Sequence, residues 1–175
     1  AAESNIKEKP SGYALEGTAG HELAELCLTK NRTAISYLNQ TLPESGWKVS
    51  DEDWCEHVQT YVDYVDQFKG TRFIEQRVDF SKYVPEGFGT ADAIVIDNDI
   101  MHIIDLKFGK GIKVYADNNS QGKLYAIGAL CDYGFLYDIT KIVIHIVQPR
   151  IDNISVWEIS VKDLLIWAEW VKERA

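Results

Sequence analysis

Two aspartates and one lysine near the middle of the chain have a spacing suited to binding a metal ion. Asp92 and Asp105 lie in two runs rich in Ile and Val that flank the polar pair Asn98-Asp99, a pattern typical of a β-hairpin with a two-residue loop. The register of that hairpin places Asp92 directly opposite Asp105, with Cβ atoms about 4.5–5.5 Å apart. Because side chains alternate along a strand, Lys107 is predicted to share a face with Asp105.

Side chains placed in this way need a partner of opposite charge. Two carboxylates about 4 Å apart repel each other by roughly 4 kcal/mol at an effective dielectric near 20, so one takes up a proton or a cation lies between them. Oxygen ligands on a rigid hairpin suit Mg²⁺ or Mn²⁺, with water in the remaining positions. Lys107 beside such an ion can orient or deprotonate an attacking water, or neutralise charge on a phosphate. A surface hairpin with one Asp–Lys pair explains the same residues without any activity.

Four short segments between residues 17 and 125 extend this pattern. They are Gly17-Thr18-Ala19-Gly20-His21, Gly89-Thr90-Ala91-Asp92, Ile104-Asp105-Leu106-Lys107 and Gln121-Gly122-Lys123-Leu124-Tyr125. In this order they resemble the motifs of the PD-(D/E)XK nuclease superfamily in its RecB-like form: an upstream histidine, the two acidic motifs of the hairpin and a Q-x-x-x-Y signature on the following helix. Within the superfamily the chain is most similar to uncharacterised phage-encoded RecB-like exonucleases.

The resemblance implies which groups bind the metal and which act on water. The implied ligands of Mg²⁺ or Mn²⁺ are the side chains of His21, Asp92 and Asp105 and the main-chain carbonyl of Leu106. Lys107 is implied to position or activate the attacking water, so that it is catalytic together with the two aspartates. RecB-like nucleases often carry a glutamate near the metal on the strand before the hairpin. The residue in that place here is Glu75, which the resemblance adds to the catalytic group.

Several of these residues also have ordinary structural explanations. His21 and Glu25 are four apart on a predicted helix and share a polar face, where such residues are commonly solvated. Glu25 can also serve to orient the histidine ring. Glu75 is equally consistent with a solvent-facing carboxylate beside Arg77. The sequence leaves the roles of Glu25 and Glu75 open.

The charge of the chain bears on whether it binds nucleic acid. The net charge of −9 is unfavourable for binding a polyanion. From Lys107 to Lys123, however, four lysines and one aspartate give a net charge of +3, and a divalent metal would add to it. The residues predicted to contact DNA are Gln121, Tyr125, Lys110, Lys113 and Lys123. Without the resemblance, an exposed Gln and Tyr four apart on a helix would be surface or packing residues.

The elements that position these groups follow from hydrophobic periodicity and turn residues. Residues 1–16 are expected to form a flexible N-terminal arm, and residues 17–175 a single domain. Helices are predicted to begin near Thr18, after a capping box at residues 50–53, at about residue 117 and after Ser160. Strands are predicted at residues 72–80, in the hairpin, at 141–148 in the sheet interior and at 156–160. In this order they form an α/β domain with a mixed central β-sheet flanked by α-helices, which is also the restriction-endonuclease-like core that the resemblance implies.

Periodicity also predicts which side chains are buried. In the strand at residues 72–80, one face is predicted to carry Ile74, Val78 and Phe80 and the other Glu75, Arg77 and Asp79. In the helix at residues 117–133, the predicted buried stripe is Leu124, Ile127 and Cys131, with Gly128 allowing close approach of a neighbouring element. His145 is expected to be a hydrogen-bonded core residue, and Arg150, just beyond the interior strand, to be near enough for a phosphate contact.

The amino-acid composition indicates a globular protein without a membrane-spanning segment. Hydrophobic content of 46% and charged content of 26% are typical of soluble globular proteins, and no apolar run approaches the ~20 residues of a membrane span. Three scattered cysteines predict reduced, mostly buried thiols in a cytoplasmic protein, in the host cytoplasm if the protein is phage-encoded. Their spacing argues against a zinc site and against the iron–sulfur branch of RecB-like nucleases, which by resemblance needs four cysteines.

The paired carboxylates and Lys107 favour a metal-dependent nuclease that hydrolyses phosphodiester bonds. The resemblance implies that it is a DNA nuclease, and among these an exonuclease, in phage DNA recombination, replication or processing. The expected partners are DNA and either a second copy of the chain or a phage recombination or replication protein, with no membrane partner. Three alternatives stay open. They are a nuclease-like fold that binds nucleic acid or protein without cutting, a structure-specific endonuclease, and an enzyme that acts on RNA or nucleotides.

Overall fold

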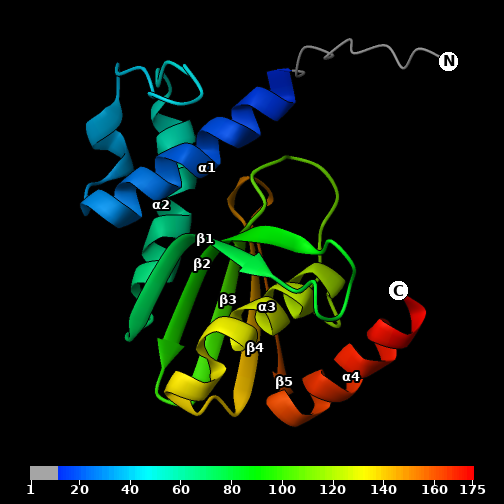
Figure 1. The fold of residues 1–175 in the computed structure, drawn as a ribbon. Coiled ribbons are helices and arrows are strands. Elements are labelled where there is room, and N and C mark those ends of the chain that lie inside the picture. Colours follow the sequence, from blue (N-terminus) through cyan, green and yellow to red (C-terminus); the bar gives the residue numbers. More distant parts are fainter. Residues whose placement is uncertain (1–11) are drawn as a thin grey trace, which may run out of the picture.

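Five strands form a single mixed β-sheet in the computed structural model of the chain, which describes residues 12–175. The strands are β1 (Thr71–Asp79), β2 (Phe88–Asp97), β3 (Ile100–Leu106), β4 (Lys141–Gln148) and β5 (Asn153–Ser160). They lie in the sheet in chain order (Figure 1). All neighbours are antiparallel except β3 and β4, which are parallel because a helical crossover connects them.

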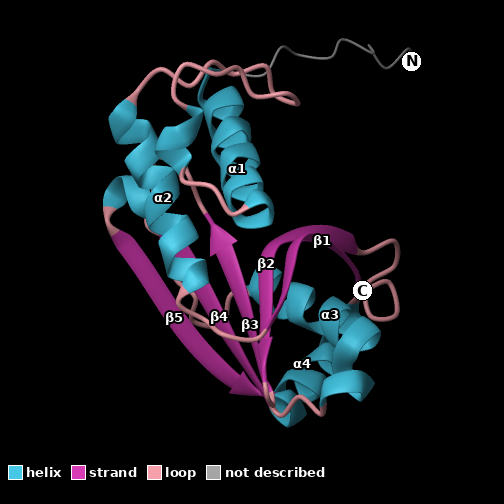
Figure 2. Cartoon of the chain, turned by 90° about the vertical axis from the view of Figure 1, so that its left-hand side faces the viewer, coloured by secondary structure: helices cyan, strands magenta, loops and turns pink. Residues whose placement is uncertain are grey.

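Helices cover both faces of this sheet (Figure 2). They are α1 (Gly12–Lys30), α2 (Glu52–Asp66), α3 (Ser120–Tyr137) and α4 (Val161–Arg174), with short 3₁₀ turns at Ala34–Tyr37 and Pro149–Ile151. Helices α1 and α2 pack on one face through a cluster that includes Leu23, Val58, Ala93, Ile104 and Leu106. Helices α3 and α4 pack on the other face through a cluster that includes Ile94, Ile103, Ile127, Ile144 and Leu164. This arrangement confirms the predicted fold class. No helix within residues 12–175 has both the length and the apolar character needed to cross a membrane.

The hairpin of β2 and β3 has the predicted two-residue loop. Asn98 adopts the left-handed conformation, with φ of +53°, that a tight turn between antiparallel strands requires. The register pairs Asp97 with Ile100, as predicted, and continues to the pair Ala93 and Ile104. The main-chain ladder ends there. Asp92 and its predicted partner Asp105 therefore lie just beyond the last pair of the ladder.

Helix α1 begins earlier than predicted. It starts at Gly12, inside the segment expected to be an arm, and residues 1–11 lie outside the described residues. Residues 14–16 are Ala, Leu and Glu, which are good helix formers and extend the helix toward the N-terminus. Thr18 is not an N-cap, because its hydroxyl donates a hydrogen bond to a carbonyl one turn earlier inside the helix. Helix α2 is capped by Asp51 rather than by the first residue of the predicted capping box.

The alternation of side chains in β1 reverses at Glu75. Ile74 packs against the cluster under α1 and α2, whereas Val78 packs in the cluster under α3 and α4, so the prediction that they share a face is wrong. Glu75 has a φ of +49°, a left-handed conformation that is rare for a residue with a Cβ. The alternation of β2 reverses at the same level, since Ala93 belongs to the first cluster and Ala91 to the second.

Two histidines form a chain of hydrogen bonds beneath α2. His145 in β4 is 3% exposed and makes hydrogen bonds with the Tyr64 hydroxyl at 2.6 Å and with Nδ1 of His102 at 2.8 Å. Burial, aided by the neighbouring His102, lowers the pKa of His145 from 6.5 to about 3. The prediction that His145 is a hydrogen-bonded core residue is confirmed.

Helix α3 buries a stripe that differs from the predicted one. Ile127 is buried, but Cys131 is exposed, so the expectation of mostly buried thiols holds for Cys27 and Cys55. Gly128 allows the predicted close approach, because a Cβ there would lie 2.9 Å from the Cβ of Val78 in β1.

Candidate metal and nucleic-acid site

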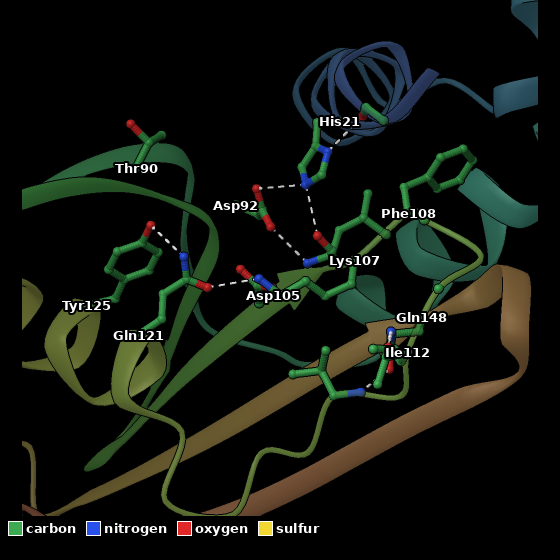
Figure 3. Close-up of a pocket in the computed structure, with 15 residues that line it drawn as sticks. His21, Thr90, Asp92, Asp105, Lys107, Phe108, Ile112, Gln121, Tyr125 and Gln148 are labelled. Carbon is green, nitrogen blue, oxygen red and sulfur yellow. Dashed lines mark hydrogen bonds and ion pairs between the residues drawn. The ribbon is translucent and has the colours of Figure 1, made fainter. Parts of the chain in front are cut away.

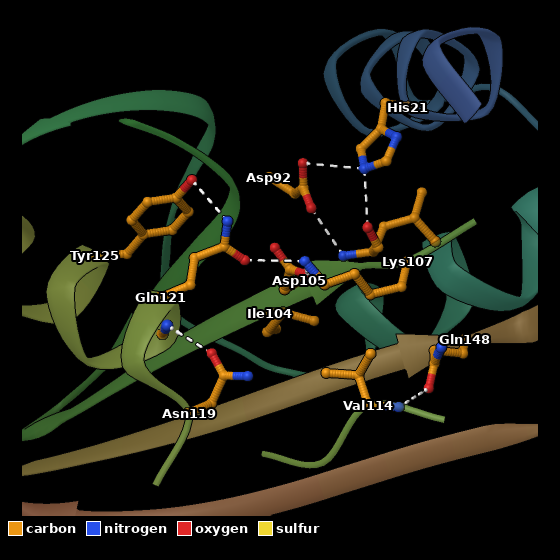
Figure 4. A network of polar contacts seen from close by, with 12 residues as sticks. His21, Asp92, Ile104, Asp105, Lys107, Val114, Asn119, Gln121, Tyr125 and Gln148 are labelled. Atoms are coloured by element: carbon orange, nitrogen blue, oxygen red, sulfur yellow. Dashed lines mark hydrogen bonds and ion pairs between the residues drawn. The ribbon is translucent and has the colours of Figure 1, made fainter. Parts of the chain in front are cut away.

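Asp92 occupies the point at which β2 separates from β3. Its Oδ2 accepts a hydrogen bond from the main-chain amide of Leu106 at 2.8 Å, in the position where a continued ladder would supply a strand carbonyl (Figure 4). Leu106 is buried, so the carboxylate satisfies an amide that water does not reach. The bond fixes the Asp92 side chain and leaves Oδ1 facing His21.

His21 projects from α1 toward the end of β3. Its Nε2 lies 2.8 Å from the carbonyl oxygen of Leu106 and 3.5 Å from Oδ1 of Asp92, and its Nδ1 lies 2.9 Å from the carbonyl oxygen of Gly17. Burial lowers the pKa of His21, but the Asp92 carboxylate and the two carbonyls outweigh burial and raise it to about 9. The proton on Nε2 thus lies among oxygen atoms predicted to be metal ligands. A metal cation in the place of this proton would contact the Leu106 carbonyl oxygen, Oδ1 of Asp92 and Nε2 of His21.

A chain of polar contacts connects β3 to α3. Lys107 Nζ lies 3.1 Å from Oδ2 of Asp105 and donates a hydrogen bond to Oε1 of Gln121 at 2.9 Å. Gln121 Nε2 in turn donates a hydrogen bond to the Tyr125 hydroxyl at 3.2 Å (Figure 4). These contacts bring together the Asp-x-Lys and Gln-x-x-x-Tyr segments, which are separate in the sequence.

The Asp105 carboxylate is crowded. Burial and then the charge of Asp92 raise the pKa of Asp105 from 3.8 to about 7, against the lowering effect of Lys107. Its Oδ2 is buried and forms an ion pair with the Lys107 ammonium at 3.1 Å. Lys107 offsets part of the free-energy cost of burying this carboxylate beside Asp92, and a divalent cation between the two carboxylates would offset more of it.

These groups fit a small, hard cation that keeps part of its water. Among residues 12–175, no three side chains of His, Cys, Asp or Glu come close enough to form a metal cage by themselves. Mg²⁺ seldom uses such cages, because it retains several waters and binds one or two carboxylates. The donor set favours a cation here, because the charges of Asp92 and Asp105 oppose each other and a divalent ion would offset more of that repulsion than the Lys107 ammonium does. The groups that would hold it are Asp105, Asp92, the His21 ring and the Leu106 carbonyl.

Glu75 faces a second cavity on the other side of Asp92. This cavity of about 520 Å³ is lined by acidic side chains together with His21, and the acidic residues are Glu22, Glu25, Glu44, Glu75 and Asp92. Burial, followed by the charges of Asp92 and Glu25, raises the pKa of Glu75 from 4.5 to about 7. Glu75 is half-buried and, among the described residues, forms no ion pair, so the alternative of a solvent-facing carboxylate beside Arg77 finds no support.

Glu22 and Glu25, both in α1, also line the acidic cavity. Glu22 has a structural role, because its carboxylate accepts hydrogen bonds from the main-chain amides of residues 44–45 at 2.6 and 2.9 Å. Glu25 does not orient the His21 ring, since the Gly17 carbonyl occupies the Nδ1 side of that ring. Burial raises the pKa of Glu25, and the nearby carboxylates add to the effect.

The predicted metal ligands open onto a cavity of about 490 Å³ (Figure 3). One wall carries Asp105 and Lys107 of the strand end and Gln121 and Tyr125 of α3. The other wall is the loop after β3, which contributes Gly109, Gly111, Ile112 and Val114, together with Gln148 from the end of β4. The cavity is open to solvent, so the carboxylates and Lys107 are accessible to a substrate.

A family model described as "Protein of unknown function (DUF2800)" matches residues 1–175. The chain belongs to the DUF2800 family. The DUF2800 chain is also similar to a protein named SSO0001, known from a crystal structure, with 16% identity over 96% of this chain and 78% of that chain and a TM-score of 0.31. A likeness at that score carries no argument, and the family description names no activity. The function has to be inferred from the residues of the DUF2800 chain itself.

Four of the predicted DNA-contact residues of the DUF2800 chain lie at or beside the cavity of about 490 Å³. Gln121 and Tyr125 line it. Lys110 and Lys113 are exposed on the loop that forms its second wall. Their positions are compatible with contact to a phosphate backbone.

Lys123 and Arg150 of the DUF2800 chain contact other side chains and do not face the cavity. Lys123 is 5% exposed and its Nζ lies 4.0 Å from the ring centroid of Trp167 in α4, so its prediction as a DNA contact is wrong. It follows Gln121 by two residues, which turns its side chain by roughly 200° around the helix and away from the cavity. Arg150 forms an ion pair with Glu16 of α1 and is largely buried, so it is not available to a phosphate.

Two glycines of the motif segments, to which the sequence analysis assigned no separate role, also shape the site of the DUF2800 chain. A Cβ at Gly20 would lie 2.6 Å from the Phe108 ring, so glycine lets α1 settle on the end of β3 and brings His21 to Leu106. Glycine inside a helix is unfavourable and signals such a packing need. Similarly, a Cβ at Gly89 would lie 2.5 Å from the ring of Tyr125.

Proposed function

We propose that this protein is a Mg²⁺- or Mn²⁺-dependent nuclease that hydrolyses phosphodiester bonds of DNA, acting from a strand end. The observation that carries the proposal is the convergence of Asp92, Asp105 and the His21 ring beside Lys107 on the wall of an open cavity. The resemblance of the same segments to RecB-like PD-(D/E)XK nucleases also supports it. That resemblance implies a role in phage DNA recombination, replication or processing.

Each group has a separate task in this reaction. A divalent ion held by the two aspartates, the histidine and the Leu106 carbonyl would stabilise negative charge on the scissile phosphate and make bound water more acidic. Lys107 is fixed between Asp105 and Gln121, so its ammonium group can donate a hydrogen bond to the attacking water or to a phosphate oxygen. Gln121 and Tyr125 line the path of the strand and can contact its backbone or a base.

The charges of the two cavities indicate how the strand approaches. The acidic cavity repels a phosphate backbone, because its titratable lining is carboxylates and His21. The cavity of about 490 Å³ carries Lys107 and is bordered by the loop with Lys110 and Lys113. A strand therefore enters over the loop and α3 and does not continue past Asp92 into the acidic cavity. This favours cleavage at a strand end over cleavage within a continuous strand.

The test is Mn²⁺-dependent digestion of labelled linear DNA by the purified protein. We expect the DNA to shorten with Mn²⁺ or Mg²⁺ and not with EDTA. Lys107→Ala should lower the rate by about 100-fold or more, the usual range for loss of a fixed hydrogen-bond donor to charge that develops in the transition state. Lys162→Ala, at an exposed position on α4, is the matched control and should cut like the wild type. A Lys107→Ala protein with the wild-type rate would refute the assignment.

A second candidate is a module that binds nucleic acid or protein without cutting. The net charge of −9 and the acidic cavity favour it over catalysis. It predicts Mn²⁺-dependent retention of DNA with no change in its length. Covalently closed circular DNA separates the remaining enzymatic alternatives, since a strand-end nuclease leaves it intact and a structure-specific endonuclease opens it. Labelled RNA of the same sequence tests whether the enzyme requires deoxyribose or also cuts RNA.

A further inference from the structure

The paired ends of β1 and β2, residues 76–79 and 88–91, pass over α3 and leave one face exposed (Figure 1). Gly89 faces α3, because a Cβ there would lie 2.5 Å from a tyrosine ring of that helix. Side chains alternate along a strand, so Phe88 and Thr90 point away from α3. Both are exposed, and they form the outer face of this part of the sheet.

Phe88 is an exposed aromatic side chain with a cation beside it. Its exposed fraction is 59%, so the ring adds little to the stability of the fold. The Cζ atom of Arg77 lies 4.4 Å from the ring centroid and covers one face of the ring. Arg77 is itself exposed, and among residues 12–175 its guanidinium forms no ion pair. The rest of the ring and the guanidinium N–H groups are therefore open to a ligand.

Thr90 connects this pair to the candidate metal site. It lines the cavity of about 490 Å³ (Figure 3) and pairs with Arg77 across the ladder. Phe88 lies two residues away on the same face, about 6.8 Å along the strand. Successive nucleotides of a stacked strand are about 3.4 Å apart, so this distance spans one or two nucleotides. A strand that leaves the cavity over Thr90, on the side of α3, brings its next bases to Phe88.

We propose that Phe88 and Arg77 form a stacking site for one base of the single strand whose end lies at Asp92 and Lys107. The proposal rests on the proposed function and adds a binding site for the strand outside the cavity. Aromatic rings bind single strands by stacking on bases, and they tolerate any sequence because every base has a π-face. The base stacks on the ring face that Arg77 leaves free, and Arg77 donates hydrogen bonds to the adjacent phosphate.

The charges around the ring determine on which side that phosphate lies. Asp79 is the cross-strand partner of Phe88 and is exposed. Hydrogen bonds from the side chain and the main chain of Ser81 lower the pKa of Asp79, so its carboxylate stays charged and repels a phosphate. The phosphate therefore lies on the side of Arg77 and Thr90, which is the side nearer the cavity.

Binding of a labelled single-stranded oligonucleotide tests the stacking site without cleavage. We would use the Lys107→Ala protein with Mn²⁺ and measure the dissociation constant by fluorescence anisotropy. Adding Phe88→Leu, which keeps an apolar side chain but removes the ring, should weaken binding about tenfold, whereas Phe88→Trp should keep the affinity. Phe135→Leu, at an exposed phenylalanine of α3, is the matched control and should bind like the parent protein.

Oligonucleotides with one abasic position locate the stacked base. We would move the abasic position through the first several nucleotides from each end. At one position the missing base should weaken binding to the Lys107→Ala protein about tenfold, and adding Phe88→Leu should then cost nothing further. If Phe88 only holds β1 and β2 together, the penalty for Phe88→Leu is the same at every abasic position.

Salt dependence tests the phosphate contact of Arg77. Arg77→Gln should weaken binding and reduce the slope of log affinity against log salt concentration by about 0.7, the value for one phosphate contact to a single strand. Arg174→Gln is the matched control, because that guanidinium lies 4.1 Å from the ring centroid of the exposed Trp170 at the far end of α4. An unchanged slope in Arg77→Gln would show that Arg77 does not contact a phosphate.

The outcomes separate the stacking site from the proposed function. A loss in Phe88→Leu that disappears at one abasic position supports the stacking site even if the protein cuts no DNA, in which case only the nuclease assignment fails. Cleavage of single strands with equal affinities of the parent and Phe88→Leu proteins, or with the same penalty at every abasic position, overturns the stacking site and leaves the nuclease intact. Absence of single-strand binding overturns both.

Discussion

The Asp92 carboxylate accepts the hydrogen bond from the Leu106 amide that the main chain of β2 would otherwise accept. The same residue that completes the sheet therefore also presents an oxygen atom to His21. Its structural and chemical roles lie on different atoms, Oδ2 and Oδ1, and can be separated by substitution.

Asp92→Asn and Asp92→Ala are expected to differ in stability but not in activity. The amide oxygen of Asn can still accept the Leu106 N–H, whereas Ala leaves a buried amide unpaired at a cost of about 1–3 kcal/mol. Both variants lose a charged ligand and should lose Mn²⁺-dependent cleavage. Urea unfolding measures the first effect and digestion of labelled DNA the second. Equal unfolding free energies for the two variants would show that the hydrogen bond is not formed.

Removing Asp105 should stabilise the protein when no metal is bound. Asp105→Asn relieves the crowding of a buried carboxylate beside Asp92, and a gain of about 1 kcal/mol would raise the melting temperature by about 2–4 °C for a chain of this size. With excess Mn²⁺ the order should reverse, because the wild type gains binding free energy and the variant does not. Thermal unfolding in EDTA and in Mn²⁺ provides the comparison. A variant stabilised by Mn²⁺ as strongly as the wild type would exclude Asp105 as a ligand.

Gly20 and Gly17 offer opposite outcomes for the same substitution in one helix. Gly20→Ala places a Cβ 2.6 Å from the Phe108 ring, which should cost about 1–3 kcal/mol and displace His21. Gly17→Ala meets no atom within 4 Å and should stabilise α1 by about 0.5–1 kcal/mol. Chemical unfolding gives both values. A Gly20→Ala protein as stable and active as the wild type would contradict the packing described for α1.

The buried pair His102 and His145 should make the fold sensitive to acid. The folded protein holds His145 neutral down to a pKa of about 3, whereas the unfolded chain takes up the proton near pH 6.5. Stability from this group is complete above pH 6.5 and falls as the pH drops from 6.5 toward 3, by about 2 kcal/mol at pH 5. Unfolding free energies at pH 7 and pH 5 test this. His145→Gln should show a loss smaller by that amount, and an identical loss would contradict the shift.

The sequence was sufficient to predict the hairpin and the order of elements. Asn98-Asp99 between two β-branched runs has few alternatives as a turn, and the register follows from loop length alone. From that register the proximity of Asp92, Asp105 and Lys107 follows, because strand geometry fixes it over a short distance. The contacts of Lys107 with Gln121, and of His21 with Leu106, depend on how helices dock on the sheet. These two contacts could be predicted only from the resemblance to known motifs.

Two errors have physical causes that composition does not reveal. Lys123 lies in a lysine-rich segment, yet helix geometry turns it against Trp167, where a cation packs on an indole ring. The reversal at Glu75 requires a left-handed residue in the middle of a strand, and glutamate gives no sign of it because glycine or asparagine is the usual choice. Such strain is retained only where surrounding structure enforces it, which is common at functional sites.

The reversal in β1 and β2 has a consequence for the length of these strands. Glu75 and Asp92 stand across from each other between the pairs Ile74–Ala93 and Gln76–Ala91. Each strand therefore carries one residue more than an uninterrupted ladder needs, and the two extra residues match. Loss of either one alone would leave the other as an unmatched residue, a β-bulge, whereas loss of both together would restore an uninterrupted ladder without the acid. The two strands stay in register past this level because each carries one extra residue.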